Sequence, residues 1–399
     1  MKTSYTNKII VSLLLFVVVC TSCNDNDDKK ESVQHLETST FQFGNDKDEI
    51  LNLFAFAGID QLDDYLTHDV KIYELEYKTQ YLGEEIIASG LVTFPDTSEP
   101  MPMLSFQHGT MVGHDEAPTV NRDYTLLSNL ASAGYIFLIP DFIGFGSSSE
   151  VLHPYYHADL TANSILDMVQ AAEELAKQEG FDFNGDLYLA GYSEGGFATM
   201  AAHKAYEEHP IDGIKLIASA PASGGYDVKG MQEYFFSLDT YHQPFYLAYV
   251  AMSYFSTYSD WTLSLSDMFN EPYATDIPKY FDGSYSGGDI NDKLTNDVNE
   301  LLTETFLDEV DTNDKFDELN DAFEENSLDA WVPEIRMIMY HGDADITVPY
   351  QNSVDAYENM ITLGTSSDIL SFISIEGGTH GTGFFPYVED FIKKFDELK

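Results

Sequence analysis

The sequence has few cysteines and few basic residues. Only two of its 399 residues are cysteines, Cys20 and Cys23, and both stand near the N-terminus. No disulfide bond can therefore join distant parts of the chain's body, so its stability must come from packing. Lys and Arg together number 19 against 68 Asp and Glu, which gives a formal net charge of −49. This charge repels nucleic acid and anionic membrane surfaces, so neither is an expected partner.

Motifs that bind cofactors or metals are also missing. The chain has no glycine-rich phosphate loop, no basic patch suited to nucleic acid, and no pair of histidines with metal-ligand spacing beside a carboxylate. We therefore expect no cofactor and no metal. The length and a hydrophobic content of 44% are sufficient for one large α/β domain with an insertion, or for two ordinary domains.

Residues 186–206 carry the strongest functional pattern. An apolar run at 187–190 predicts a buried strand, the sequence G-Y-S-E-G follows at 191–195, and residues 197–206 predict a helix. A G-x-S-x-G sequence between a strand and a helix predicts a sharp turn that exposes the serine hydroxyl. The glycines lack Cβ atoms and let the strand and the helix approach each other closely. Ser193 is therefore the candidate nucleophile.

A serine hydroxyl needs a base within hydrogen-bond distance and a third group that orients this base. His380 stands in a glycine-rich loop after the predicted last strand at 370–375 and is the candidate base. Asp345 follows the predicted strand at 336–340 and is the candidate orienting carboxylate, with Asp343 as the alternative.

A tetrahedral intermediate also needs two amide donors for its negatively charged oxygen. The first candidate is the backbone N–H of Glu194, the residue after the nucleophile. The second is the N–H of Thr110, or alternatively of Gly109, in the loop after a predicted strand at 103–107. Glu194 brings a carboxylate close to this oxygen. Only its backbone is required there, so its side chain can point away.

The remaining pattern alternates strands with helices and predicts a doubly wound, mostly parallel α/β sheet. It begins with an antiparallel hairpin at 70–94, and the candidate site residues follow strand ends, where sites on such sheets lie. The core is predicted at 46–221 and 334–399. The insertion at 222–333 is predicted to be a helical cap over the site. Its many aromatic residues are expected to form the core of the cap or to line a site for an apolar substrate, and the two roles are compatible.

Several motifs resemble those of the α/β-hydrolases, and more narrowly of the secretory lipase group of microbial esterases, over residues 65–399. They are A-S-G-L-V-T-F-P at 88–95, Q-H-G-T at 107–110, P-D at 140–141, G-Y-S-E-G-G at 191–196, H-G-x-x-D-x-x-V-P at 341–349 and G-T-H at 378–380. The chain order Ser, Asp, His is also that of this fold. The resemblance implies a cap between the sixth and seventh strands and hydrolysis of carboxylic esters.

The N-terminus resembles a bacterial lipoprotein signal. Lys2 and Lys8 precede an apolar run at 9–19, and small residues precede Cys23. The acidic run at 24–28 is similar to the surface-export tether of Bacteroidetes lipoproteins. The resemblance implies a signal peptide at 1–22, lipidation of Cys23, a flexible tether at 23–45, and a location at the outer membrane or cell surface with membrane contact only through the lipid. The alternatives are secretion with cleavage near Ser22 and an uncleaved anchor.

These observations predict a serine esterase or lipase at the cell surface that works through an acyl-serine intermediate. Its substrate would be a small-molecule ester that is either apolar or carried by a polysaccharide. One alternative is a serine peptidase of the same fold, in which acidic cap residues would anchor a charged peptide terminus. Another is an inactive hydrolase fold that serves as a surface binding module, against which the complete set of candidate residues argues.

Overall fold

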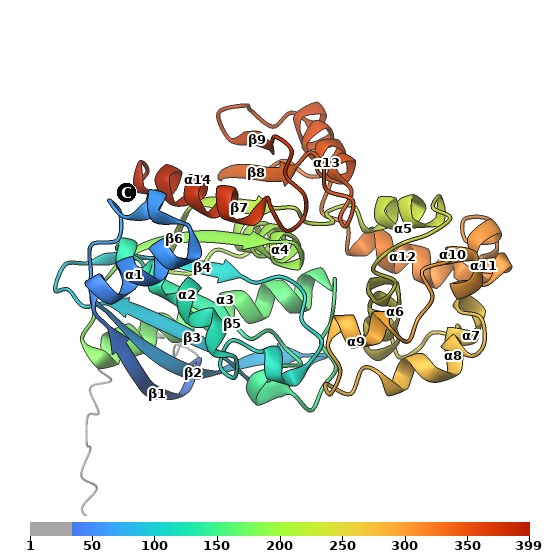
Figure 1. Cartoon of the computed structure of the whole chain (residues 1–399), viewed down its shortest axis with the longest axis horizontal. Coiled ribbons are helices and arrows are strands. Elements are labelled where there is room, and N and C mark those ends of the chain that lie inside the picture. The colour runs from blue at the N-terminus through green and yellow to red at the C-terminus, as the bar shows by residue number, and fades with distance from the viewer. Residues whose placement is uncertain (1–33) are drawn as a thin grey trace, which may run out of the picture. The chain divides into compact units, whose positions relative to one another are not determined.

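A nine-stranded, mostly parallel sheet runs through residues 34–399, the part of the chain that this computed structural model describes (Figure 1). The order across the sheet is β1-β2-β3-β5-β4-β6-β7-β8-β9. The strands are β1 (Leu36–Asn45), β2 (Val70–Tyr81), β3 (Glu84–Pro95), β4 (Met101–Gln107), β5 (Ile136–Pro140), β6 (Phe183–Tyr192), β7 (Lys215–Ala222), β8 (Arg336–Gly342) and β9 (Leu370–Ile375). From β5 to β9 all neighbouring strands are parallel.

The antiparallel part of the sheet is larger than the sequence predicts. β2 and β3 form the expected hairpin, and β1 pairs with the outer edge of β2. The predicted flexible tether at 23–45 is therefore wrong for residues 36–45. Leu36 is the only buried side chain of β1, so backbone pairing holds this strand and no apolar pattern marks it. The predicted signal peptide at 1–22, the lipidated Cys23 and tether residues 23–33 lie outside the described residues.

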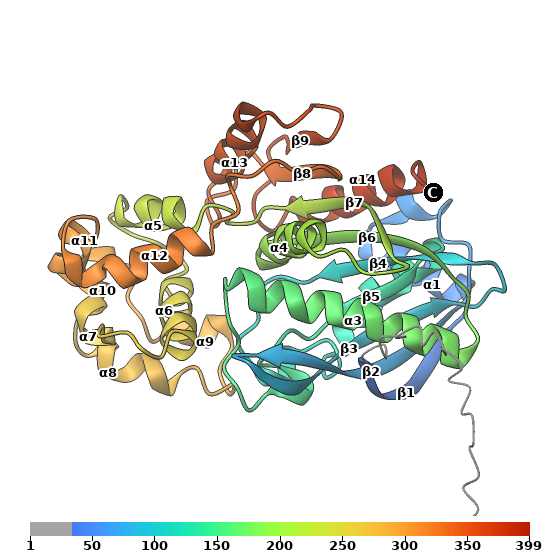
Figure 2. The same cartoon turned by 180° about the vertical axis from the view of Figure 1, so that it is seen from behind.

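Helices cover both faces of the sheet. Alternate residues of each strand face opposite sides, so Met103 and Leu187 belong to one apolar cluster whereas Leu104 and Tyr188 belong to another. α3 (Ala158–Glu179) and α4 (Glu194–Glu208) pack on the first face, and α1 (Lys47–Ala57) and α14 (Phe384–Asp396) pack on the second (Figures 1 and 2). α2 (Thr125–Ser128) packs on the second face, whereas α13 (Tyr350–Leu363) packs against Met337 and Met339 of β8 on the other face.

The segment between β7 and β8 forms the helical cap. Its helices are α5 (Val228–Phe236), α6 (Phe245–Thr257), α7 (Leu265–Met268), α8 (Tyr273–Asp276), α9 (Gly287–Asn291), α10 (Val298–Leu301), α11 (Glu304–Glu309) and α12 (Asp317–Glu325). Figures 1 and 2 show them beyond the end of the sheet at which α4 begins. The cap follows the seventh strand because β1 adds one strand to the expected count. No helix in the described part of the chain is long and apolar enough to cross a membrane.

Candidate active site

Ser193 occupies a sharp turn between β6 and α4. Its backbone has φ 62° and ψ −126°, a conformation that costs free energy for a residue with a side chain and that clusters at functional sites. The Ser193 N–H donates to the carbonyl oxygen of Ala222 at 2.9 Å, which fixes the turn to the end of β7. The sequence therefore builds the strained serine turn that the G-x-S-x-G motif predicts.

Glycines at 191 and 195 allow this turn to form. A Cβ atom on Gly195 would lie 1.9 Å from the carbonyl oxygen of Gln107, at the end of β4. A Cβ atom on Gly191 would lie 2.2 Å from the carbonyl oxygen of Gly195. Both distances are far below van der Waals contact, so only glycine fits at these positions and brings the loop after β4 next to Ser193.

The structure brings Ser193, His380 and Asp345 together in one hydrogen-bonded chain. His380 Nε2 lies 2.8 Å from Ser193 Oγ, and His380 Nδ1 lies 2.6 Å from Asp345 Oδ2. A carboxylate only accepts, so Nδ1 carries a proton and the lone pair of Nε2 faces the serine hydroxyl. This arrangement can withdraw the serine proton during nucleophilic attack.

Asp345 is held as a carboxylate by groups on every side. Burial favours its neutral form, but hydrogen bonds from His341 and His380 outweigh this and hold the pKa of Asp345 well below its usual range. Its other oxygen, Oδ1, accepts from the N–H groups of Thr347 at 2.9 Å and Val348 at 3.2 Å. Asp345 therefore stays charged and can stabilise a protonated His380.

His341 is a site residue whose role sequence reasoning missed. Its Nε2 lies 3.2 Å from Asp345 Oδ2 and 3.1 Å from the carbonyl oxygen of Val348. Both partners are acceptors, so Nε2 is protonated and donates. Its Nδ1 lies 2.6 Å from Ser353 Oγ, which donates to it. The motif H-G-x-x-D contained this histidine, but the sequence alone does not show which way its ring points.

Asp343, the alternative orienting residue, holds the histidine loop instead. Its Oδ1 accepts from the N–H of Gly377 at 2.7 Å. Tyr192 Oη donates to the carbonyl oxygen of His380 at 2.9 Å. The two residues thus fix the loop from opposite ends, whereas Asp345 is the carboxylate that contacts the His380 ring.

The predicted oxyanion donors lie around Ser193. The Glu194 N–H is at the first turn of α4, where the helix dipole favours negative charge. Gly109 is adjacent, because a Cβ atom built on it would lie 3.5 Å from Ser193 Cβ. Within residues 34–399 no acceptor is bonded to the N–H of Glu194, Gly109 or Thr110. Thr110 Oγ1 is bonded to Tyr155 Oη at 3.1 Å.

The Glu194 side chain forms a buried pair with His153. His153 Nε2 lies 2.5 Å from Glu194 Oε1, and the two side chains are 2% and 3% exposed. His153 Nδ1 lies 2.7 Å from the carbonyl oxygen of Ile143, an acceptor, so this nitrogen is protonated. A second proton must then lie between Nε2 and Oε1. The pair carries no net charge whichever atom holds that proton, so Glu194 places no uncompensated charge beside the oxyanion.

The other histidines near the site are structural. His108 Nδ1 donates to the carbonyl oxygen of Gly109 at 2.8 Å, and burial lowers the pKa of His108, which keeps it neutral. His203, on α4, bonds to Ser219 of β7 and to Glu207 on its own helix. In the described residues no group of three His, Cys, Asp or Glu side chains could hold a metal ion.

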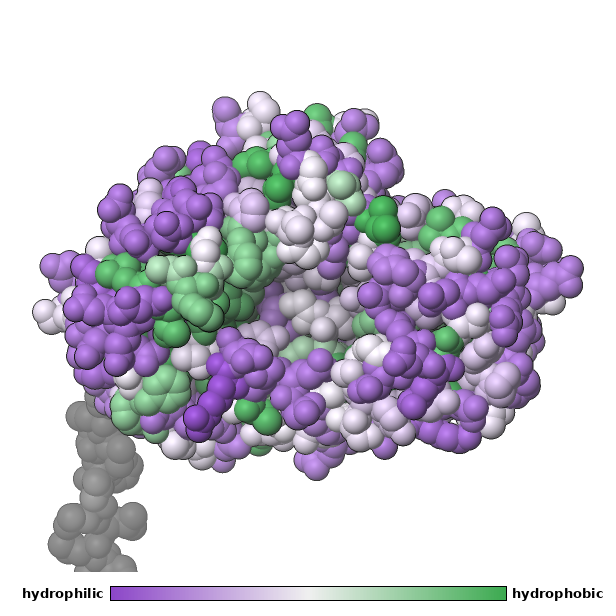
Figure 3. All heavy atoms as spheres, viewed as in Figure 1, coloured by the Kyte–Doolittle hydropathy of each residue, from purple (hydrophilic) through white to green (hydrophobic). Residues whose placement is uncertain are grey.

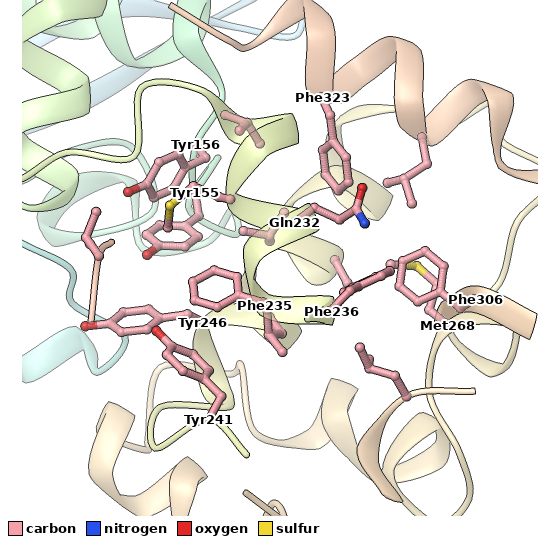
Figure 4. A pocket seen from close by; sticks show the side chains of 18 of the residues that line it. Tyr155, Tyr156, Gln232, Phe235, Phe236, Tyr241, Tyr246, Met268, Phe306 and Phe323 are labelled. Carbon is pink, nitrogen blue, oxygen red and sulfur yellow. The ribbon is translucent and has the colours of Figure 1, made fainter. Parts of the chain in front are cut away.

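A large apolar cavity lies between Ser193 and the cap. The empty space in it, counted out to the open solvent, is about 830 Å³. Figure 4 shows the tyrosines and Phe235 on one side of it, and Phe236, Phe306, Phe323 and Met268 on the other. The lining is Tyr155, Tyr156, Ser193, Val228, Met231, Gln232, Phe235, Phe236, Tyr241, Tyr246, Leu247, Val250, Ala251, Met268, Phe269, Leu302, Phe306, Leu319, Phe323, Thr347 and Val348. Figure 3 shows the surface hollowed where the cap meets the core, with apolar residues along the core side.

Comparisons with known proteins point to the same fold. A family model described as the prolyl oligopeptidase family matches residues 122–209, less than half of the chain. A crystal structure of a putative hydrolase from Legionella pneumophila is 27% identical, with a TM-score of 0.83, and the match covers 92% of this chain and 99% of that one. A comparison with curated protein sequences gave no match.

Two further solved structures are similar. A variant of the rice cell wall degrading esterase LipA from Xanthomonas oryzae is 25% identical, with a TM-score of 0.79 and coverage of 91% of this chain and 99% of that one. Candida antarctica lipase A is 16% identical, with a TM-score of 0.63 and coverage of 91% and 82%. The prediction of an α/β-hydrolase fold is confirmed, and the fold and its relatives support a serine hydrolase.

Proposed function

We propose that this protein hydrolyses carboxylic esters with an apolar acyl chain, through an acyl-Ser193 intermediate. The observation that carries the proposal is the cavity that opens at Ser193. None of its lining residues is Asp, Glu, Lys or Arg, and most are aliphatic or aromatic. The acyl group stays on the serine between the two half-reactions, whereas the alcohol must leave. An interior apolar cavity therefore suits the acyl chain.

The mechanism follows from the hydrogen-bonded chain. His380 Nε2 accepts the proton of Ser193 Oγ as this oxygen attacks the ester carbonyl carbon. Asp345 stabilises the protonated ring, and the N–H of Glu194 with that of Gly109 or Thr110 donates to the oxyanion. The intermediate expels the alcohol, which takes the proton from His380. Water activated by the same histidine then attacks the acyl carbon and releases the acid.

A serine peptidase is the second candidate, favoured by the match to the prolyl oligopeptidase family. A peptidase that recognises a charged N-terminus needs carboxylates near the nucleophile. The cap is rich in acidic residues, but none of them lines the cavity at Ser193. The matched residues 122–209 include the strand-serine-helix unit, which esterases and peptidases of this fold share. The cavity lining therefore favours the ester.

One substrate comparison separates these functions. p-Nitrophenyl esters of increasing acyl length are assayed beside aminoacyl p-nitroanilides, with Ser193→Ala as the control. We expect kcat/KM to rise with chain length and ester turnover to vanish in Ser193→Ala. Faster cleavage of the anilides would contradict the proposal. A preference for acetyl or feruloyl esters would instead favour a polysaccharide-borne ester, in line with the cell wall degrading relative.

We also propose that a lipid on Cys23 holds the enzyme at the outer membrane or cell surface. The support is the signal pattern before Cys23 and the acidic run after it. Metabolic labelling with an alkyne fatty acid in a bacterial host should label the wild type and leave Cys23→Ser unlabelled. Equal labelling of both proteins would contradict the proposed lipidation of Cys23.

A further inference from the structure

Gln232 is the only carboxamide among the residues that line the cavity. It stands on α5 in the cap and is 7% exposed. Figure 4 shows its amide group among the rings of Phe236, Phe306 and Phe323, on the side of the cavity away from Tyr155. An amide that lines a cavity can offer a ligand any hydrogen-bonding group that the protein itself does not use.

The orientation of this amide follows from its neighbour Lys229. Lys229 Nζ donates to Gln232 Oε1 at 2.8 Å. An ammonium group has no acceptor, so the amide oxygen, and not the nitrogen, must face Lys229. Lys229 is itself held by Asn320 Oδ1 at 2.8 Å and by the carboxylate of Asp311. Gln232 Oε1 is therefore held by Lys229, and two further cap residues hold Lys229 in turn.

The nitrogen of the same amide is free. No residue within the described range, 34–399, accepts a hydrogen bond from Gln232 Nε2, and this nitrogen keeps some surface that solvent can reach. A bound water needs about two to four polar partners. The rings of Phe236, Phe306 and Phe323, which surround the amide in Figure 4, offer a water no strong hydrogen-bond partner. The free N–H group is thus suited to an acceptor carried by a ligand.

We propose that Gln232 Nε2 donates a hydrogen bond to an oxygen atom on the acyl chain of the substrate, a hydroxyl or keto group some distance from the ester. The preferred substrates are then esters of oxygenated fatty acids. The proposal rests on the proposed function, because it assigns the cavity to the acyl chain. A site built around a hydrogen-bond donor discriminates against the analogue that lacks the matching acceptor, since its donor is then left unpaired.

The test moves an oxygen substituent along the acyl chain of the substrate. All substrates are p-nitrophenyl esters of the same acyl length. One series carries a hydroxyl group and a second a keto group, each at successive carbons, and the unsubstituted ester is the reference. At one carbon we expect the oxygenated ester to have a kcat/KM about 5- to 10-fold higher than the plain ester, the size expected of one hydrogen bond. Gln232→Met should remove this preference, and Gln351→Met, the same change on an exposed helix surface, should keep it.

A second variant separates donors from acceptors. In Gln232→Glu the carboxylate only accepts, so the preference should persist for the hydroxyl series and vanish for the keto series. The proposal is overturned if no position of the oxygen helps the wild type, or if Gln232→Met keeps the preference. Calorimetric binding of free hydroxy and plain fatty acids to Ser193→Ala gives the same comparison without turnover. If the wild type hydrolyses no ester, the proposed function is refuted, and the binding comparison still tests the role of Gln232.

Discussion

Ser193, His380, Asp345 and His341 form one continuous hydrogen-bonded chain. The carboxylate at its centre fixes the proton of His380 on Nδ1. In Asp345→Asn the amide can present its NH₂ group to the ring and stabilise the other tautomer. We expect kcat for a p-nitrophenyl ester to fall about 10³-fold or more, with a much smaller change in KM. Steady-state kinetics of the purified variant measure both constants.

Asp343→Asn is the matched control for this change. Its amide oxygen can still accept from the Gly377 N–H, so the histidine loop keeps its support. A loss of less than about tenfold is expected, because one neutral hydrogen bond replaces one to a charged group. Equal losses in the two variants would mean that Asp343 shares the role given to Asp345.

The buried pair of His153 and Glu194 can be tested by a double-mutant cycle. In Glu194→Gln the amide can donate to His153 Nε2, so activity and stability should change little. His153→Phe leaves the Glu194 carboxylate buried without a partner and should lower the free energy of unfolding by about 3–5 kcal/mol. The cost of His153→Phe should fall to about 1–3 kcal/mol in the Glu194→Gln background. Urea denaturation of the four proteins measures the coupling, and additive effects would contradict it.

The sequence predicts which residues follow strand ends, but it does not predict which residues contact a given buried side chain. Ser193, Asp345 and His380 each come just after a predicted strand, so the parallel sheet brings them to one edge. His153 stands 41 residues before Glu194, and nothing between them in the sequence indicates that they touch. The free Nε2 of Gln232 depends in the same way on Lys229 and on the cap fold.

At the scale of elements, the close approach of α4 to the end of β4 places the proposed oxyanion donors next to Ser193. Gly195→Ala should disrupt it, because a Cβ atom would lie 1.9 Å from the Gln107 carbonyl oxygen and 2.6 Å from that of His108. We expect kcat to fall by about 10²-fold or more, the loss typical of a missing oxyanion donor. Gly288→Ala, on a cap helix where the new Cβ atom would meet only Ser286 Oγ at 3.7 Å, should be nearly neutral. An active Gly195→Ala enzyme would refute this role.

Asp141, at the end of β5, joins three elements and should give stability a pH dependence. It accepts from Ser89 Oγ on β3 and from the hydroxyl and N–H of Thr119. Burial raises the pKa of Asp141 to about 6 from 3.8, although these hydrogen bonds oppose the rise. A raised carboxyl pKa means that the folded state binds the proton more tightly, so this contribution to stability is complete below 3.8 and is lost as the pH rises through about 6.

Asp141→Asn removes the titration and keeps the shape. Between about pH 4 and pH 7 the wild type should lose up to about 3 kcal/mol of unfolding free energy relative to this variant, the equivalent of the pKa shift. Chemical denaturation of both proteins across this range gives the difference. A constant difference would show that Asp141 does not titrate there.

Secondary structure could be predicted from the sequence where burial against the core repeats apolar residues at the period of a strand or a helix. The apolar runs of β4 to β9 and the spacing in α3 are set by contact with the core. β1 is almost wholly exposed, so only its pairing with β2 defines it. Residues 122–133 form only a short α2 between 3₁₀ turns, and the second of these turns ends at Gly134 in a left-handed conformation.

At the scale of the whole described chain, the cap and the hydrolase core share one apolar cluster. Phe197 and Met200 of α4 belong to the same cluster as Phe235, Tyr249 and many other cap residues. Some of the cap aromatics fill its core, as expected, and others line the cavity at Ser193. The packing that stabilises the cap therefore also shapes this cavity.

Covalent labelling of Ser193 tests the central claim most directly. The wild type and Ser193→Ala are treated with a p-nitrophenyl alkylphosphonate, which phosphonylates an activated serine. The masses of the intact proteins are then measured by mass spectrometry. We predict one adduct on the wild type, located at Ser193 by peptide mapping, loss of ester hydrolysis in step with labelling, and no adduct on Ser193→Ala. Equal labelling of both proteins, or an unlabelled wild type that still hydrolyses esters, would contradict the assignment of Ser193 as the nucleophile.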